Sequence, residues 1–308
     1  MKSKINFQVL LLLGSTVVLW ASAYSAIRIG LQAYTPGSLG LLRFLAASIV
    51  LCGSALFNQV RLPDLEDGLR ITLMALTGVT IYNIALCSGE LVVEAGTASF
   101  LTATVPIFTV ILAVIFLKEE IYLNTYIGII VGFIGVAMIT LGGSSTPQFT
   151  SGALLVLVAA FSQSAYFVLQ KPLLLKYSAL ELVSYTVWIG MLSMLIFLPQ
   201  LIQEMPQASF DATWSIIYLG IFPAAIANLT WAKGLSQTLA CTASSFLYFV
   251  PIVAVCIAWI CLGEVPSVTA IAGEFISLLG ILIINAWSSL LLLFRFTQKR
   301  VVEDQGSV

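Results

Sequence analysis

The sequence predicts an all-α integral membrane protein with ten transmembrane helices, arranged as two inverted five-helix repeats. Apolar residues make up 60% of the 308 residues and charged residues only 9%, against roughly 45–50% and 25% in a soluble domain. Apolar runs of membrane-spanning length recur along the whole chain, and its second half repeats the first in register. These observations exclude a soluble globular protein and place nearly all of the chain in the bilayer.

Each predicted helix is an apolar run of about 20 residues, the length that crosses the hydrocarbon core. The polar stretch 142–152 divides the runs into two sets of five. The first set covers 8–30, 36–57, 69–89, 95–117 and 122–141, and the second covers 152–170, 180–201, 213–233, 239–262 and 267–289. Lys2 and Lys4 make the first run look like a signal peptide, but nine further runs favour an uncleaved first helix.

Basic residues predict the orientation, because Lys and Arg near helix ends are retained on the cytoplasmic side. With the N-terminus inside, the predicted outer loops contain no Lys or Arg. The predicted inner segments contain Lys2, Lys4, Arg61, Arg70, Lys118, Lys171, Lys176, Lys233, Arg295, Lys299 and Arg300. We therefore expect a multi-pass protein of the cytoplasmic (inner) membrane with both termini cytoplasmic. Only Arg28 and Arg43 depart from this pattern.

A shift of 145 residues aligns the second half with the first without a gap. The aligned polar, Pro and Gly residues are Asn83/Asn228, Thr97/Thr242, Ser99/Ser244, Pro106/Pro251, Glu119/Glu264 and Gly128/Gly273. Apolar composition alone would not place these residues in register, so the chain contains an internal repeat. Because five helices per half is an odd number, the halves enter the membrane in opposite orientations. We predict repeats at 1–143 and 152–289, followed by a cytoplasmic tail at 290–308.

The inverted repeat points to a secondary transporter, in which the solute binds near the membrane midplane between the halves. Thirteen basic and fourteen acidic residues leave no basic surface for nucleic acid. The chain has no His, no Walker-type phosphate loop and no paired-carboxylate site. We therefore expect no enzyme activity, no cofactor and no metal, with a small-molecule solute and the lipid bilayer as partners.

Several stretches resemble a known transporter family. They are Trp20-Ala-Ser-Ala-Tyr24 with Arg28, Leu42-Arg43-Phe44, Pro106–Glu120 and Pro251–Glu264. Together with the repeat, they resemble the EamA family of the drug/metabolite transporter (DMT) superfamily over nearly the whole chain. Two positions depart from the family pattern, since Ala21 and Lys118 stand where Gly is usual. The resemblance implies export or exchange of amino acids, other metabolites or drugs across the cytoplasmic membrane.

Polar residues and prolines within the predicted helices are candidates for the solute path. Asn83 and Asn228 occupy equivalent positions, where an unpaired amide would be costly in hydrocarbon. They either face a shared cavity or form interhelical hydrogen bonds. Pro106 and Pro251 predict kinks in equivalent helices, either in a moving cavity wall or as static bends. Thr102 and Tyr248 would line the N-terminal side of these bends.

Aromatic residues supply the other cavity candidates. Trp20 and Tyr24 share one helical face at a spacing of four residues. Tyr166 and Trp231 lie within helices that are expected to line a central path. The alternative is that such residues anchor helix ends at the membrane surface.

Charged residues inside the predicted helices need partners or water. Arg43 and Glu274 lie at similar depth and could pair, although Arg43 could also hold Glu94 or backbone carbonyls. Glu274 is a candidate proton carrier, with structural pairing or an oligomer contact as the alternative. Arg28 and the acidic pair Glu90/Glu94 fall at outer helix ends, where they either form a gate held by ion pairs or remain as solvated charges at headgroup level.

The sequence thus favours a secondary-active exporter or exchanger of small organic metabolites, such as amino acids or related amphipathic compounds, working by alternating access. A multidrug or toxic-compound exporter is the alternative, and a membrane receptor or an intramembrane lipid enzyme is less favoured. The spacing Gly128-x-x-x-Gly132 would suit close helix packing or a homodimer face.

Overall fold

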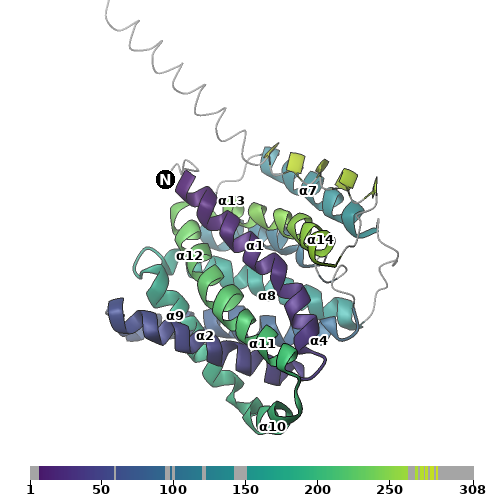
Figure 1. Cartoon of the computed structure of the whole chain (residues 1–308). Helices are drawn as coiled ribbons and strands as arrows, with labels where there is room; N and C mark the ends of the chain where they lie inside the picture. The colour runs from purple at the N-terminus through teal and green to yellow at the C-terminus, as the bar shows by residue number, and fades with distance from the viewer. Residues whose placement is uncertain are drawn as a thin grey trace, which may run out of the picture.

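All regular secondary structure in the described part of the computed structural model of this chain is helical (Figure 1). The described residues are 7–58, 60–93, 98, 101–119, 123–141, 151–262, 268–269, 271–273, 275–276, 278–280 and 282–283. No strand occurs among them. The all-α prediction is therefore confirmed, while the predicted tail at 290–308 lies outside the described residues.

Six helical segments in the described part of the chain are long and apolar enough to cross a membrane. They are α1 (Phe7–Gly30), α2 (Pro36–Asn58), Leu65–Glu90 with α3 (Gly68–Ala75) and α4 (Tyr82–Glu90), α8 (Ser151–Leu173), Ala179–Gln207 with α9 (Ala179–Ser193) and α10 (Leu198–Glu204), and Phe210–Gln237 with α11 (Phe210–Leu219) and α12 (Ala227–Gln237). Each segment lies on one predicted range, and most segment ends fall within a few residues of the predicted ends.

Shorter apolar helices lie in the other four predicted ranges. They are Val105–Leu117, which begins with α6 (Val105–Leu112), Leu123–Gly135 in α7 (Leu123–Leu141), Ala240–Ala254, which joins α13 (Ala240–Ser245) to α14 (Phe249–Leu262), and Ile271–Gly280. Ten membrane crossings therefore remain a prediction, supported by six long helices and these shorter ones.

Local sequence explains several helix starts. Pro36 opens α2, where its fixed φ suits the first turn and its missing N–H costs nothing. Ser178 caps α9 by accepting a hydrogen bond from the Glu181 backbone, and Glu181 bonds back to Ser178 in a capping box. Ser209 caps α11 by accepting a hydrogen bond from the Ala212 backbone N–H, without a bond in return.

The two halves share an uncommon backbone geometry. A π-helical segment joins α3 to α4 at Leu76–Ile81, and another joins α11 to α12 at Gly220–Ile226. The 145-residue shift carries the first segment onto positions 221–226, within the second. Because π-helical turns are rare and are frequent at functional sites, this coincidence shows that the repeat extends from sequence into backbone structure at this point. A third π-helical segment, Ala113–Leu117, has no counterpart, since its equivalent positions lie in α14.

Helices of the first half pack against helices of the second. In Figure 1, α1 runs beside α11 and α12, and it contacts both of them and α14. Likewise α2 packs on α9, while α4 and α6 pack on α8. The halves are therefore interleaved, and any space at their centre is bounded by both.

The glycines of α7 serve packing inside the chain. A Cβ added at Gly280 would overlap the backbone nitrogen of Gly132 and the backbone oxygen of Gly128. Only a residue without a side chain allows the two helices to approach so closely. This contact accounts for the spacing of Gly128 and Gly132 without a second copy of the chain, and a homodimer remains a prediction.

Ion pairs tie together the helix ends that are predicted to be cytoplasmic. Arg61 pairs with Glu181 at 3.0 Å, and Lys176 pairs with Asp64 at 2.7 Å and with Asp67 at 2.6 Å. Hydrogen bonds to these two carboxylates raise the pKa of Lys176 above its ordinary value. Its ammonium group therefore stays charged at physiological pH, and the segment before α3 is held to the turn between α8 and α9.

Lys118 follows the end of the helix Val105–Leu117 in a left-handed backbone conformation, with φ 52° and ψ 36°. It is the only non-glycine residue with positive φ among the described residues. The resemblance identified this position as one where Gly is usual, and the structure supplies the reason, since Gly adopts this conformation without a Cβ clash.

We expect Lys118→Gly to stabilise the protein by about 0.5–1 kcal/mol, because relief of left-handed strain outweighs the entropy that Gly adds to the unfolded chain. Thermal unfolding in detergent measures the effect. Lys118→Ala removes the same charge and keeps the strain, so it should give no such gain. An equal gain in both variants would assign the effect to charge instead.

Candidate functional site

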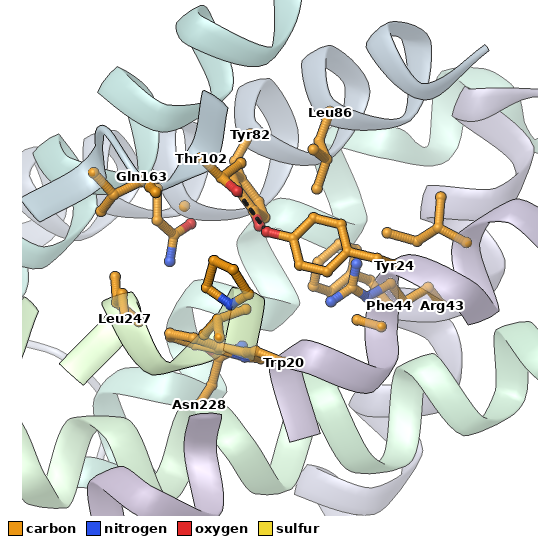
Figure 2. Close-up of a pocket in the computed structure, with 17 residues that line it drawn as sticks. Trp20, Tyr24, Arg43, Phe44, Tyr82, Leu86, Thr102, Gln163, Asn228 and Leu247 are labelled. Atoms are coloured by element: carbon orange, nitrogen blue, oxygen red, sulfur yellow. Dashed lines mark hydrogen bonds between the residues drawn. The ribbon is translucent and has the colours of Figure 1, made fainter. Parts of the chain in front are cut away.

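A cavity lies at the centre of the bundle, between the two halves (Figure 2). Its wall includes α1, α2 and α4 from the first half and α8, α12 and α14 from the second. The cavity volume, measured as the space that the centre of a water molecule can occupy, is about 60 Å³. This volume holds a few water molecules. A larger solute therefore requires the walls to move apart.

First-half residues supply the aromatic, charged and hydroxyl side chains of the wall. They are Trp20, Tyr24, Arg43, Phe44, Tyr82 and Thr102. The Tyr24 hydroxyl lies 2.6 Å from Thr102 Oγ1, the bond drawn in Figure 2. Since Thr102 donates to the Ala98 carbonyl at 3.0 Å, the Tyr24 hydroxyl is the donor between them. This bond links α1 to the segment that precedes α6.

Second-half residues supply amide and apolar groups. They are Gln163, Asn228, Leu247, Val250 and Pro251. Gln163 is 7% exposed, and its Oε1 has no hydrogen-bond partner. Asn228 is half-buried and donates from Nδ2 to the Ala224 carbonyl at 2.8 Å, within its own helix. Both side chains can therefore still accept a hydrogen bond from a bound solute.

Arg43 contributes the charge of the wall. Its side chain is 5% exposed, and its Nη1 donates to Asn83 Oδ1 at 3.2 Å. Its Nε has no hydrogen-bond partner. A buried guanidinium with unused donor capacity binds a carboxylate strongly.

A tight helix contact holds the Arg43 segment in place. A Cβ added at Gly220, where the second π-helical segment begins, would overlap the Arg43 carbonyl oxygen and approach Ala46 Cβ to 2.6 Å. The absence of a side chain at Gly220 therefore lets α2 lie directly against this segment, with the Arg43 guanidinium at the cavity wall.

The two equivalent asparagines occupy different environments. Asn228 lines the cavity, whereas Asn83 is 0% exposed and lies behind the wall as the partner of Arg43. Across the repeat shift, Arg43 corresponds to Trp188, which carries no charge. The second half therefore has no guanidinium at the matching position to draw Asn228 away from the cavity.

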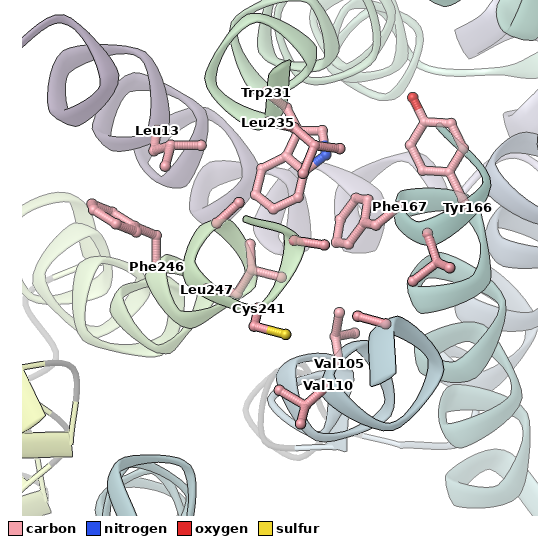
Figure 3. Packing of buried hydrophobic residues seen from close by; sticks show 14 of the residues in the cluster. Leu13, Val105, Val110, Tyr166, Phe167, Trp231, Leu235, Cys241, Phe246 and Leu247 are labelled. Carbon is pink, nitrogen blue, oxygen red and sulfur yellow. The ribbon is translucent and has the colours of Figure 1, made fainter. Parts of the chain in front are cut away.

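Three aromatic candidates lie outside the lining. Trp231 is 1% exposed and packs on Phe167 at 4.1 Å and on Trp20 at 5.3 Å between ring centroids, within the cluster of Figure 3. The Tyr166 hydroxyl accepts from Gln170 Nε2 at 2.8 Å, and the Tyr248 hydroxyl donates to the Ile129 carbonyl at 3.2 Å. These three side chains support the wall from behind.

The two prolines begin helical segments. Pro106 is the second residue of α6, after a turn at Ala103–Thr104, and Pro251 is the third residue of α14, after the 3-10 turn Phe246–Tyr248. At a helix start the missing N–H of proline has no intrahelical partner to lose. The helical path is thus interrupted at equivalent points in both halves, and only Pro251 touches the cavity.

Of three carboxylates considered in the sequence analysis, the structure describes only Glu90. Glu274, the proposed partner of Arg43, lies outside the described residues, as does Glu94. Glu90 is 5% exposed, so the expectation of a solvated headgroup-level charge is wrong for this residue.

No cluster of three or more His, Cys, Asp and Glu that could hold a metal occurs among the residues searched, which are those that the structure describes.

Sequence reasoning overlooked Gln163. It lies between Ser162 and Ser164, so three consecutive polar residues interrupt the apolar run of α8. The Ser164 hydroxyl bonds the Ala160 and Val105 carbonyls, and the Ser162 hydroxyl bonds the Thr77 carbonyl. The polar run was a usable signal, but which of its members faced the cavity depended on the helix packing.

Comparison with known proteins shows matches over nearly the whole chain. The model of the EamA-like transporter family matches residues 7–141 and again residues 150–286. A Bacillus subtilis (strain 168) protein named uncharacterized transporter YdfC is 40% identical over 263 residues, which are 85% of this chain and 86% of that protein. A Streptantibioticus cattleyicolor protein named probable terminal-alkyne amino-acid exporter is 38% identical over 270 residues, which are 88% and 91% of the two chains.

A solved structure, described only as the crystal structure of a protein, has the same fold. It superposes with a TM-score of 0.77 over 92% of this chain and 98% of its own, at 17% sequence identity. At that identity the likeness bears on the fold alone.

We expect Asn83→Ala to lower the free energy of unfolding by about 1.5–3 kcal/mol, because it removes the acceptor of a buried guanidinium. Asn228→Ala is the matched control, since its bond is local and its side chain is half-buried, and it should cost under about 1 kcal/mol. Unfolding of both variants in detergent measures this difference. The double variant Arg43→Met with Asn83→Leu should recover part of the loss. Equal losses for the two asparagines would contradict the asymmetry.

Proposed function

We propose, from the premise that this chain belongs to the EamA-like transporter family, that it is a secondary-active exporter or exchanger of small zwitterionic metabolites, with amino acids as the substrate class. The solute binds in the central cavity, and the two halves expose it alternately to the two sides of the membrane. The relatives described above are named as transporters, which supports a transport role over a catalytic one.

The observation that carries the proposal is the set of unpaired polar atoms at the cavity. Arg43 offers a positively charged donor, and Gln163 Oε1 is an acceptor without a partner. A buried polar atom without a partner destabilises the protein, and a ligand that bonds to the atom removes this cost. An α-amino acid presents one carboxylate, which complements the Arg43 donor, and one ammonium group, which complements the Gln163 acceptor.

The remaining wall suits the rest of such a molecule. The aromatic rings of Trp20, Tyr24 and Tyr82 can contact an ammonium group through their faces. Leu247 and Val250 give an apolar surface for a side chain. The named activity of the Streptantibioticus cattleyicolor relative, probable export of terminal-alkyne amino acids, concerns the same substrate class.

A multidrug exporter is the second candidate, and the aromatic lining favours it, because flat rings suit bulky amphipathic compounds. Arg43 weighs against it, since a buried guanidinium repels the cationic amphiphiles that such proteins commonly carry. Transport of ethidium without transport of amino acids would select this alternative.

Access to the cavity would change at the irregular points of the backbone. The π-helical segments Leu76–Ile81 and Gly220–Ile226 and the turns before Pro106 and Pro251 lie at equivalent points in both halves. Such points have fewer regular hydrogen bonds and bend more readily than an α-helix. Paired bending points fit inverted halves that rock against each other.

A counterflow experiment tests the substrate class. Proteoliposomes with purified protein, loaded with unlabelled L-leucine or L-propargylglycine, should accumulate the same amino acid in labelled form from outside. Uptake should be faster than in proteoliposomes without the internal amino acid. Loss of one charge-assisted or buried hydrogen bond is worth about 1.5–3 kcal/mol, so Arg43→Lys and Gln163→Leu should weaken apparent affinity about 10- to 100-fold. Gln203→Leu, at an exposed position, is the matched control.

Competition with fragments sharpens the result. Isoamylamine lacks the carboxylate of leucine and 4-methylpentanoate lacks its ammonium, so neither should compete as well as leucine. If the wild type shows no counterflow with any amino acid, or if both cavity variants behave as wild type, the proposed substrate class is wrong.

We further propose the orientation given by the basic residues, with both termini in the cytoplasm. On a background without native cysteines, Gln207→Cys between α10 and α11 should react with a membrane-impermeant maleimide added to intact cells. Leu175→Cys between α8 and α9 should react only after permeabilisation. Both side chains are exposed, so the reverse pattern would overturn the orientation.

A further inference from the structure

Glu90 lies one turn beyond the cavity along α4. Tyr82 and Leu86 line the cavity, and Glu90 follows Leu86 by four residues on the same face of that helix. Along the predicted topology this places its carboxyl between the cavity and the outer surface, although Glu90 is not part of the lining.

The Glu90 carboxyl is buried and has no partner. The residue is 5% exposed, and neither carboxyl oxygen has a hydrogen-bond partner. It forms no ion pair in the described part of the chain. An ionised carboxylate is not stable in this condition, because nothing replaces the water that it gave up.

Ionisable groups approach Glu90 from two of the helices around it. Arg28 and Tyr24 on α1 and Arg43 on α2 interact with it electrostatically, without a bond. Tyr82 and Cys87 do so from its own helix. On the remaining side Gly89 packs against α8, where Ser151–Ala160 contains no ionisable residue. The two guanidinium groups favour the ionised carboxylate when water reaches it, whereas burial favours the protonated form.

We propose that Glu90 is the proton-binding site that couples transport by this chain to the transmembrane pH gradient. When the outer end is open, its carboxylate takes a proton from a hydronium ion, forming an O–H bond and leaving water. Only the neutral carboxyl is buried as the outer end closes. The O–H bond then breaks toward water in the cavity, and the proton leaves on the other side.

This inference rests on the proposed transport function and adds its energy source. It also differs from the sequence-based candidate, because Glu274, which the sequence offered as either a proton carrier or a structural partner, lies outside the described residues. Glu90 meets the requirement through its position in the packed structure, above a cavity bounded by both halves.

The first measurement reports protonation without any solute. Infrared difference spectra of the wild type, taken across a pH titration, should show a carbonyl-stretch band of a protonated carboxylic acid that disappears as pH rises. Glu90→Gln should lack this band. Glu66→Gln, which removes an exposed carboxylate at the other end of the same helical segment, should keep it. A wild-type spectrum without a band that depends on Glu90 overturns the proposal.

The second measurement uses labelled L-leucine in proteoliposomes with an imposed pH gradient. The gradient should accelerate leucine flux in the wild type and in Glu66→Gln, and Glu90→Gln should lose this acceleration. Counterflow at equal pH should persist in Glu90→Gln, which shows that this variant is folded. Retained acceleration in Glu90→Gln, or its loss in Glu274→Gln alone, overturns the proposal.

The two measurements separate this inference from the proposed function. If wild-type protein shows no leucine or propargylglycine counterflow, the proposed substrate class fails, and the infrared band still decides whether Glu90 binds a proton. If counterflow is present and the Glu90 band is absent, the substrate class stands and the coupling site is elsewhere.

Discussion

Hydrocarbon offers no hydrogen bonds, and the structure of this chain follows from that constraint. Every backbone N–H and C=O in the bilayer must be satisfied inside the protein, and all regular secondary structure among the described residues is accordingly helical. Many polar side chains meet the same requirement by bonding neighbouring backbone or one another. Thr16 Oγ1, for example, lies 2.9 Å from the Leu12 carbonyl and 2.8 Å from Thr230 Oγ1 on α12.

The cavity wall is one of the places where this rule is relaxed. Arg43 and Gln163 keep unpaired polar atoms there, whereas the buried hydroxyls of Ser164 and Tyr248 have carbonyl partners. Unpaired buried atoms also occur away from the cavity, for example Gln170 Oε1 and Trp231 Nε1. Unpaired groups are expensive in a closed protein and are retained where a ligand or water can reach them. The same reasoning applies to the Glu90 carboxyl, which can shed its charge by binding a proton.

The internal repeat supplies a symmetric framework, and single residues make it asymmetric. Both halves place a π-helical segment at the same point and interrupt a helix just before an equivalent proline. One difference, Arg43 against Trp188, then gives the two equivalent asparagines different partners. A symmetric framework suits alternating access, whereas recognition of an asymmetric solute needs different groups on its two sides.

The sequence alone determined the helical class, the placement of the apolar helices and the 145-residue repeat, because apolar run length and residue register are properties of the chain itself. It also identified Lys118 as a departure, which the φ of 52° explains. Tertiary structure decided which polar residues share a space. Asn83 and Asn228 are equivalent in sequence, yet one bonds a guanidinium and the other lines the cavity. Glu90 reads as a helix-end charge, yet packing buries it. Burial and pairing depend on contacts between helices that are far apart in the chain. The sequence of one apolar run does not determine which of its faces other helices will cover.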